Sequence, residues 1–147
     1  MLDTELNDII VWVDSDARMP LAITILLQGY GIEVVTGRNS FDGIALIREH
    51  VPKMVVLHRL NQIQDLHAVC DAIREESELQ ETFVLVSSTE EESDEMAGLL
   101  RCGADMTILR PLDLDELLRI IEDVLQGRLS SMPGRSPGNR IIRYRGD

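Results

Sequence analysis

The sequence predicts an α/β fold in which five parallel strands form a sheet that is covered by helices on both faces. Two observations carry this prediction. Short apolar runs of four to six residues recur five times without polar alternation, which indicates strands buried on both faces. An amphipathic stretch follows each run, and regular alternation of strand and helix is typical of a parallel sheet.

The elements are predicted in chain order. The expected strands are residues 9–13, 33–36, 54–58, 83–88 and 106–109, and the expected helices are residues 17–27, 41–50, 66–75, 92–101 and 114–125. Gly31 fits the end of the first helix, because glycine tolerates a left-handed cap. The pair Asn39-Ser40 and Asp113 stand where capping side chains are expected at helix N-termini.

The charge of the chain is unevenly distributed. The 147 residues carry a net charge of −12, but residues 128–147 hold five arginines and one acid, so the preceding 127 residues carry −16. We therefore predict a domain at residues 1–127 and a basic tail or linker, rich in Ser, Pro, Gly and Arg, at residues 128–147. A body this acidic repels nucleic-acid phosphates, so we expect no nucleic-acid binding by the domain itself.

The tail has three readings, which stay open. It is a disordered arm, a linker to an output domain, or an arm that binds its own or another acidic body.

Cysteine use and hydropathy indicate a cytoplasmic protein. Cys70 and Cys102 suggest free buried thiols rather than a disulfide framework. No apolar run approaches the roughly 20 residues that cross a bilayer. The start of the chain, MLDTELNDII, lacks the pattern of a signal peptide, so we expect neither export nor membrane association.

Polar residues follow four of the predicted strands. In an open parallel sheet, ligands bind at the carboxyl ends of the strands, near the point where strand order reverses. We therefore predict the functional site at this rim. The residues there are Asp14, Ser15 and Asp16, then His58 and Arg59, then Ser87 and Ser88, then Arg110 and Pro111.

Residues 8–127 resemble the receiver domain of response regulators, the CheY-like family. The segment IIVWVDSD resembles the first strand of that family with its acidic pair, and GYGIEVVTGRNSFDGIALIREHVPKMVVLH resembles its second and third strands with the helix between them. The segment CGADMTILRPLDLDELL resembles the fifth strand and final helix. The resemblance implies a doubly wound, flavodoxin-like (βα)5 fold with strand order 2-1-3-4-5 and a role in two-component signal transduction.

The resemblance also assigns roles to the rim. In receivers, an aspartate at the end of the third strand accepts phosphate beside a divalent cation, a lysine contacts the phosphoryl group, and a Ser or Thr moves toward it. Asp14 matches the first acid and Ser87 matches the hydroxyl. Three positions depart from the pattern, because Ser15 replaces the second acid, His58 the phosphoacceptor and Arg110 the lysine.

These departures predict a degenerate phosphorylation site. Mg²⁺ prefers hard oxygen ligands, and the carboxylates expected at Ser15 and His58 are missing. We expect no metal ion, no cofactor, no aspartyl phosphorylation and no enzymatic activity. Instead, we expect Asp14 to form charge-assisted hydrogen bonds with Arg110, and with His58 as a second candidate. Thr107 stands at the position of the usual switching Tyr or Phe.

The sequence thus predicts a pseudo-receiver that acts by phosphorylation-independent binding of protein partners. The expected surface is the face of helix 92–101, strand 106–109 and helix 114–125, which receivers use for pairing, and a homodimer is one such pairing. Two alternatives stay open: a phosphorelay receiver with an unusual acceptor, and the N-terminal regulatory module of a larger output enzyme. His58 is the candidate for such an acceptor, since imidazole is a competent nucleophile, and it is also a candidate pH sensor.

Overall fold

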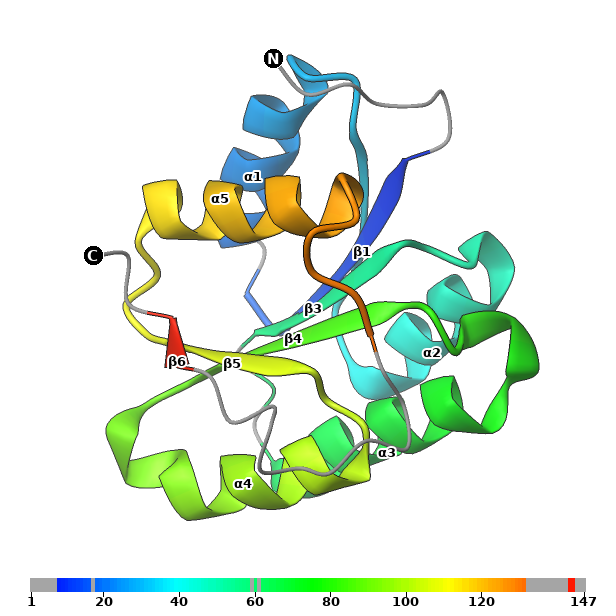
Figure 1. Ribbon diagram of the computed structural model, residues 1–147, viewed down its shortest axis with the longest axis vertical. Helices are drawn as coiled ribbons and strands as arrows, with labels where there is room; N and C mark the ends of the chain where they lie inside the picture. Colours follow the sequence, from blue (N-terminus) through cyan, green and yellow to red (C-terminus); the bar gives the residue numbers. More distant parts are fainter. Residues whose placement is uncertain (1–7, 17, 59, 61, 132–142, 145–147) are drawn as a thin grey trace.

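The strands of the chain form one parallel sheet, seen in the computed structural model of residues 8–16, 18–58, 60, 62–131 and 143–144 (Figure 1). Six strands among the described residues pair in the order β2-β1-β3-β4-β5-β6. They are β1 (Ile9–Asp14), β2 (Glu33–Gly37), β3 (Met54–His58), β4 (Phe83–Ser88), β5 (Met106–Leu109) and β6 (Arg143–Tyr144). The predicted order 2-1-3-4-5 is confirmed, and β6 is an unpredicted addition at the outer edge of β5.

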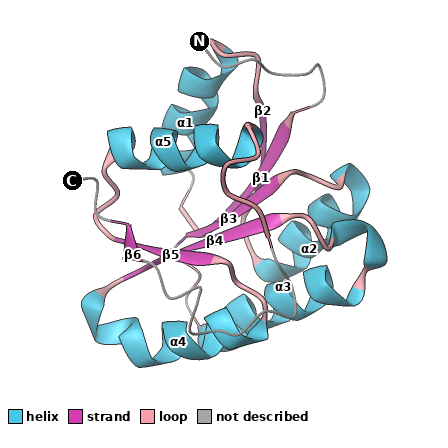
Figure 2. Cartoon of the chain, in the orientation of Figure 1, coloured by secondary structure: helices cyan, strands magenta, loops and turns pink. Residues whose placement is uncertain are grey.

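Helices cover both faces of the sheet, with α1 and α5 on one face and α2, α3 and α4 on the other (Figure 2). They are α1 (Arg18–Gln28), α2 (Ser40–His50), α3 (Ile63–Glu75), α4 (Ser93–Cys102) and α5 (Leu114–Leu125), with 3₁₀ turns at Ser77–Leu79 and Glu90–Glu92. The helix start predicted at residue 17 lies outside the described residues. No helix in the described ranges is both long enough and apolar enough to cross a membrane.

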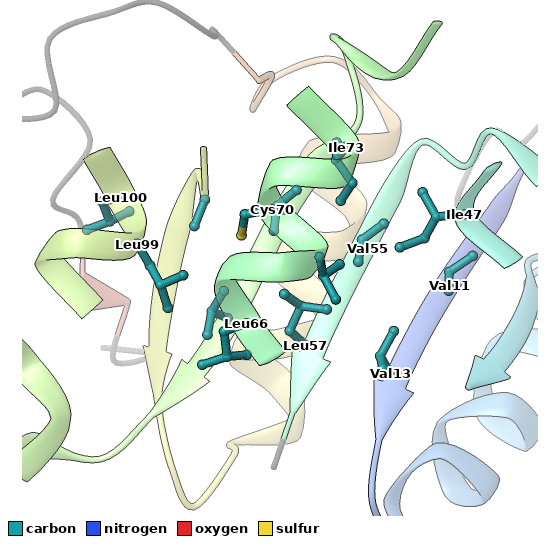
Figure 3. Close-up of a cluster of buried hydrophobic side chains, with 14 of the residues drawn as sticks. Val11, Val13, Ile47, Val55, Leu57, Leu66, Cys70, Ile73, Leu99 and Leu100 are labelled. Atoms are coloured by element: carbon teal, nitrogen blue, oxygen red, sulfur yellow. The ribbon is translucent and has the colours of Figure 1, made fainter. Parts of the chain in front are cut away.

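Each face of the sheet has its own hydrophobic layer. Trp12, Ile23 and Leu117 belong to the layer under α1 and α5, whereas Val13, Ile47 and Leu99 belong to the layer under α2, α3 and α4 (Figure 3). β1, β3 and β4 contribute side chains to both layers, which is why their sequences lack polar alternation. The predicted burial of Cys70 is confirmed, while the side chain of Cys102 lies outside the described set.

Three capping residues lie at the helix termini where the sequence predicts them. The side chain of Asn39 accepts a hydrogen bond from the backbone N–H of Asp42 at 2.8 Å, and that of Asp113 accepts one from Glu116 at 3.2 Å. Gly31 follows α1 with a φ of 77°, a left-handed value that favours glycine. The predicted start of α3 at Leu66 is wrong, because the helix already begins at Ile63, which packs partly buried against the core.

The chain still contacts the domain beyond α5. Ser131 is buried and donates a hydrogen bond to Asp105 Oδ1 at 3.0 Å, and the other oxygen of Asp105 accepts from Arg74 at 2.9 Å and from the Val84 N–H at 2.8 Å. Leu129 packs partly buried against the layer under α1 and α5. Among the described residues of the tail, these side chains and the backbone of β6 therefore meet the acidic body, while residues 132–142 and 145–147 lie outside the description. The division at residue 127 stays a prediction.

Candidate functional site at the carboxyl ends of the strands

Three polar side chains from adjacent strands lie in a row at the rim. Asp14 ends β1 directly opposite His58, which ends β3, and Ser87 lies beside His58 in β4. All three side chains are buried, with relative exposures of 0%, 2% and 4%. The predicted convergence of Asp14, His58 and Ser87 is thus observed, while Arg59 lies outside the described residues.

The imidazole of His58 is held on three sides. Its Nδ1 shares a hydrogen bond of 2.6 Å with Ser87 Oγ, and the proton that each atom carries depends on the ring tautomer. Its Nε2 lies 4.0 Å from Asp14 Oδ2. The ring of Trp12 meets the imidazole edge-on, with centroids 5.9 Å apart and an interplanar angle of 62°. The ring therefore has little room to turn.

The carboxylate of Asp14 is satisfied by donors from its own segment. Oδ2 accepts a hydrogen bond from Trp12 Nε1 at 3.0 Å, and Oδ1 accepts one from the backbone N–H of Asp16 at 2.8 Å. This arrangement follows from the strand itself, because Trp12 and Asp14 are two residues apart and project to the same face. A buried carboxylate of this kind is kept in place by directed N–H groups.

The neighbouring loop residues have partners of their own. The backbone carbonyl of Ser15 accepts a hydrogen bond from Arg38 Nη2 at 3.0 Å, which ties the loop after β1 to the loop after β2. Asp16 accepts from the backbone and the side chain of Arg18, and these contacts raise the pKa of the exposed Arg18 guanidinium. Arginines therefore bind the carbonyl of Ser15 and the carboxylate of Asp16, whereas Asp14 accepts from Trp12 and from the backbone of Asp16.

The predicted pairing of Arg110 with Asp14 is wrong. Arg110 Nη2 donates instead to Glu92 Oε1 at 3.0 Å, and the same oxygen accepts from the backbone N–H of Thr89 at 2.7 Å and from its hydroxyl at 3.0 Å. The 3₁₀ turn Glu90–Glu92 brings this carboxylate beside the end of β5, whereas Asp14 already has nearer donors. The Arg110–Pro111 peptide is cis.

Glu92 is the rim residue that the sequence reasoning missed. In the sequence, the run Glu90-Glu91-Glu92 is typical of solvated charge at the start of a helix, and this interpretation does not predict the contact with Arg110. The position of the run directly after a predicted strand was the better clue, because the turn after β4 lies next to the turn after β5.

Thr107 lies within β5 and is buried, at 3% exposure. In the sheet it pairs with Val86 of β4 on one side and with Arg143 of β6 on the other. Its neighbours Met106 and Ile108 belong to the layer under α1 and α5, so the alternation of strand side chains directs Thr107 toward the opposite face.

A pocket of about 360 Å³ opens beside the rim. It is lined by Asp14 and Asp16 together with Arg18, Met19 and Ala22 of α1. Within the described ranges, no three His, Cys, Asp or Glu side chains gather as a metal-binding cluster would.

Comparison with known proteins finds relatives among regulatory and signalling proteins. It is 30% identical over 126 residues to Protein PilH of Pseudomonas aeruginosa, covering 80% of this chain and 98% of PilH. It is 29% identical over 117 residues to the probable transcriptional regulator ycf27 of Porphyra purpurea, covering 80% of this chain and 47% of ycf27. The chain spans about half the length of the first curated relatives that it matches.

Solved structures give the same answer for the fold. The response regulator (signal receiver domain) from Bermanella marisrubri superimposes with a TM-score of 0.69 at 25% identity, over 80% of this chain and 98% of that chain. CheY4 of Vibrio cholerae superimposes with a TM-score of 0.65 at 20% identity, over 80% and 98% of the two chains. No protein-family model matches the sequence. The extent of the match to PilH, together with the strand order and the rim, shows that the chain belongs to the response-regulator receiver family of two-component signalling.

Proposed function

We propose that this receiver domain signals by binding partner proteins and that it accepts no phosphate on an aspartate. The observation that carries the proposal is the place of His58. It ends β3 opposite Asp14, which is where receivers carry the phosphoacceptor aspartate, and its ring is buried and bonded to Ser87. An acyl phosphate needs a carboxylate at that position, and an imidazole has none.

The donor set at the rim fits Mg²⁺ poorly. This ion requires near-octahedral oxygen ligands at short range. Both oxygens of Asp14 already accept hydrogen bonds from protein N–H groups, and the imidazole Nε2 of His58 on the neighbouring strand lies 4.0 Å from Oδ2. Ser15 supplies a hydroxyl in place of the second acid. We infer that the rim is held by hydrogen bonds within the chain and not by a divalent cation.

The contact between Glu92 and Arg110 supports a rim that stays in one conformation without phosphorylation. It joins the turn after β4 to the turn after β5, a link between the two segments that the phosphoryl group draws together in a conventional receiver. Here both groups belong to the chain, so the link needs no phosphate. The side chains of Glu92 and Arg110 are 33% and 22% exposed, so we expect this ion pair to add little to the free energy of unfolding. Its role is to hold the two turns next to each other.

The partner surface that we propose is the face of α4, β5 and α5. Receiver domains interact with proteins in signalling pathways, and on this face Glu91 in the 3₁₀ turn and Asp94 and Glu95 in the first turn of α4 are exposed. This acidity favours a partner with a basic docking surface. Because β6 pairs with the outer edge of β5, such a partner would contact side chains of the two helices more than the strand edge.

Incubation with acetyl phosphate and Mg²⁺, followed by intact-mass measurement, tests the proposal. We expect no phosphoryl adduct on the natural chain. The matched control is the triple variant Ser15→Asp, His58→Asp, Arg110→Lys, which returns the three missing groups and is expected to gain a phosphoryl mass at position 58. A phosphoryl adduct on the natural chain that both alkali and hydroxylamine remove would be an acyl phosphate and would contradict the proposal.

The alternative of phosphate transfer to His58 has a distinct signature. The adduct would be labile in acid but stable in alkali, where an acyl phosphate is hydrolysed, and it would be lost in His58→Gln. The observed surroundings disfavour it, because Nδ1 is engaged by Ser87, Nε2 faces a carboxylate and the ring is 2% exposed. A nucleophile needs an accessible lone pair.

The alternative of a regulatory module in a larger protein is compatible with partner binding. Its support is the length of the curated relatives, of which this chain spans about half. A reading frame that continues beyond Asp147 into an output domain would establish it.

A further inference from the structure

The strands at the two sides of the sheet differ in how they resist pairing with further segments. β2 forms one edge, and its residues Glu33 and Thr36 are exposed. β5 would form the other edge if it ended the sheet, and its sequence MTIL carries no charge. An edge strand offers unpaired N–H and C=O groups to any extended segment, and charged side chains at the edge discourage such pairing. The edge of β5 is therefore the one that is more prone to accept another strand.

The chain itself supplies a strand at this edge, because β6 lies beside β5 (Figure 1). The two strands are parallel, with Arg143 opposite Thr107 and Tyr144 opposite Ile108. On its other side β5 pairs with β4. The centre of β5 is thus flanked by a strand on both sides, and Thr107 and Ile108 are only 3% and 1% exposed.

The length of the chain permits this pairing within one copy. A parallel strand cannot follow its neighbour through a tight turn, because it needs a crossover connection of about a dozen residues or more. Residues 110–142 provide such a connection, and it contains α5. The segment from Ser131, which is buried against the domain, to Arg143 can extend over about 40 Å, which spans a domain of this size.

Charge favours the same placement without selecting it. Residues 128–147 carry a net charge of +4, and the preceding residues carry −16. This attraction keeps the tail close to the body, but it acts on the whole acidic surface and singles out no strand. The backbone pairing with the uncharged β5 is what fixes the place where the tail docks.

We propose that the outer edge of β5 is a docking site for an extended basic segment, and that the chain's own residues 143–144 occupy this site and exclude other segments from it. β6 is then an autoinhibitory strand. Backbone hydrogen bonds give such docking its affinity, and a strand of two residues forms few of them, so it can be displaced. With β6 in place a partner meets the two helices, and after displacement it also gains the edge. The docking is independent of the rim, while its effect on partners rests on the proposed use of the face of α4, β5 and α5.

Amide hydrogen exchange of the full chain, followed by NMR, tests whether the tail occupies the edge. The variant Arg143→Pro, Tyr144→Pro removes both backbone N–H groups of β6, and proline is poorly tolerated in paired strands. We expect the outward-facing amides of β5 to exchange about tenfold faster in this variant. The matched control Arg143→Ala, Tyr144→Ala has the same change of charge and keeps both N–H groups, so it should retain most of the protection. Equal exchange in the natural chain and the proline variant would overturn the proposal.

A fluorescent peptide of residues 138–147 tests whether the edge is a docking site, with anisotropy as the readout. We expect the full-length proline variant to bind this peptide at least about tenfold more tightly than the natural chain, in which the tethered tail competes. A scrambled peptide of the same composition controls for charge alone and should bind both chains equally weakly. Equal binding of the natural peptide to both chains, or binding to neither, would overturn the docking site.

Dilution distinguishes a tail that docks on its own copy from one that docks on another copy. Docking within one copy predicts the same protection of β5 at about 500 and at about 20 µM. Protection that falls on dilution would assign the tail to a second copy and overturn the proposal. None of these measurements uses a phosphodonor, so they can fail while the proposed absence of aspartyl phosphorylation stands, and the reverse.

Discussion

At the scale of single residues, the rim is stabilised by hydrogen bonds that converge on buried carboxylates. Asp14 is 0% exposed, and both of its oxygens accept N–H groups that would otherwise be buried without a partner. A carboxylate at this depth is stable because directed donors replace its water. The rim therefore depends on the acceptor oxygens of Asp14.

Replacement of Asp14 tests this dependence. Asp14→Ala leaves the indole N–H of Trp12 and the backbone N–H of Asp16 without their acceptor, so we expect a loss of about 2–4 kcal/mol in the free energy of unfolding. Asp14→Asn keeps one acceptor oxygen and should lose less. Urea unfolding followed by circular dichroism measures both. Equal losses in the two variants would mean that the negative charge matters and not the count of acceptors.

The residues of the rim were predictable in part. The ends of the strands could be predicted from the sequence. Because parallel strands end at the same edge of the sheet, this was enough to predict that Asp14, His58 and Ser87 lie close together. The hydrogen-bond acceptor of Arg110 could not be predicted from strand ends, because the long arginine side chain can reach several acidic residues. That choice depends on the 3₁₀ turn that places Glu92, and no periodicity in the sequence signals that turn.

At the scale of elements, glycine decides how closely α2 approaches the sheet. A Cβ atom built on Gly43 would lie 2.7 Å from Cγ2 of Val13 in β1, which is too close for any real contact. In contrast, a Cβ atom on Gly98 in α4 would meet nothing within 4 Å. The two glycines therefore have opposite roles, one in packing and one without a steric need.

Alanine at these two positions should have opposite effects on stability. Gly43→Ala is expected to cost about 1–3 kcal/mol by forcing α2 away from β1. Gly98→Ala should stabilise by about 0.5–1 kcal/mol, because alanine loses less backbone entropy in a helix. Thermal and urea unfolding of both variants measures this. Part of the cost of Gly43→Ala should vanish in a Val13→Ala background, and its persistence there would contradict the steric explanation.

The sequence predicts most elements to within one residue, and the exceptions are the start of α3 and the strand β6. The strands 54–58, 83–88 and 106–109 and the helix 114–125 match the structure at both ends, because continuous apolar runs and a clear apolar stripe define them. The short strand β6 was not predicted, because it joins the sheet through backbone pairing alone, and two residues show no period.

At the scale of the whole molecule, Asp105 links the end of the domain to its sheet. This buried carboxylate joins Arg74 of α3, the start of β4 and Ser131 beyond α5, at the edge of the sheet opposite the rim. The residues just after α5 thus contribute to the fold as well as connecting to the tail.

Truncation locates the end of the folding unit. We expect a chain of residues 1–127 to be less stable than one of residues 1–131 by about 2–3 kcal/mol, from the lost hydrogen bond of Ser131 and the lost packing of Leu129. Ser131→Ala in the longer chain should account for about 1 kcal/mol of that difference. Equal urea midpoints for the two chains would instead place the boundary at residue 127, as the sequence predicts.

Trp12 gives the rim a built-in optical reporter. It is the single tryptophan of the chain, it is fully buried, and its indole N–H is bonded to Asp14 while its ring meets His58. Indole emission changes with the polarity and hydrogen bonding around the ring, and a neighbouring imidazolium quenches it. Intrinsic fluorescence of the unlabelled chain therefore reports on the surroundings of Asp14 and His58 at the rim. Any ligand, proton or partner that disturbs this rim should therefore change the intensity or wavelength of the tryptophan emission.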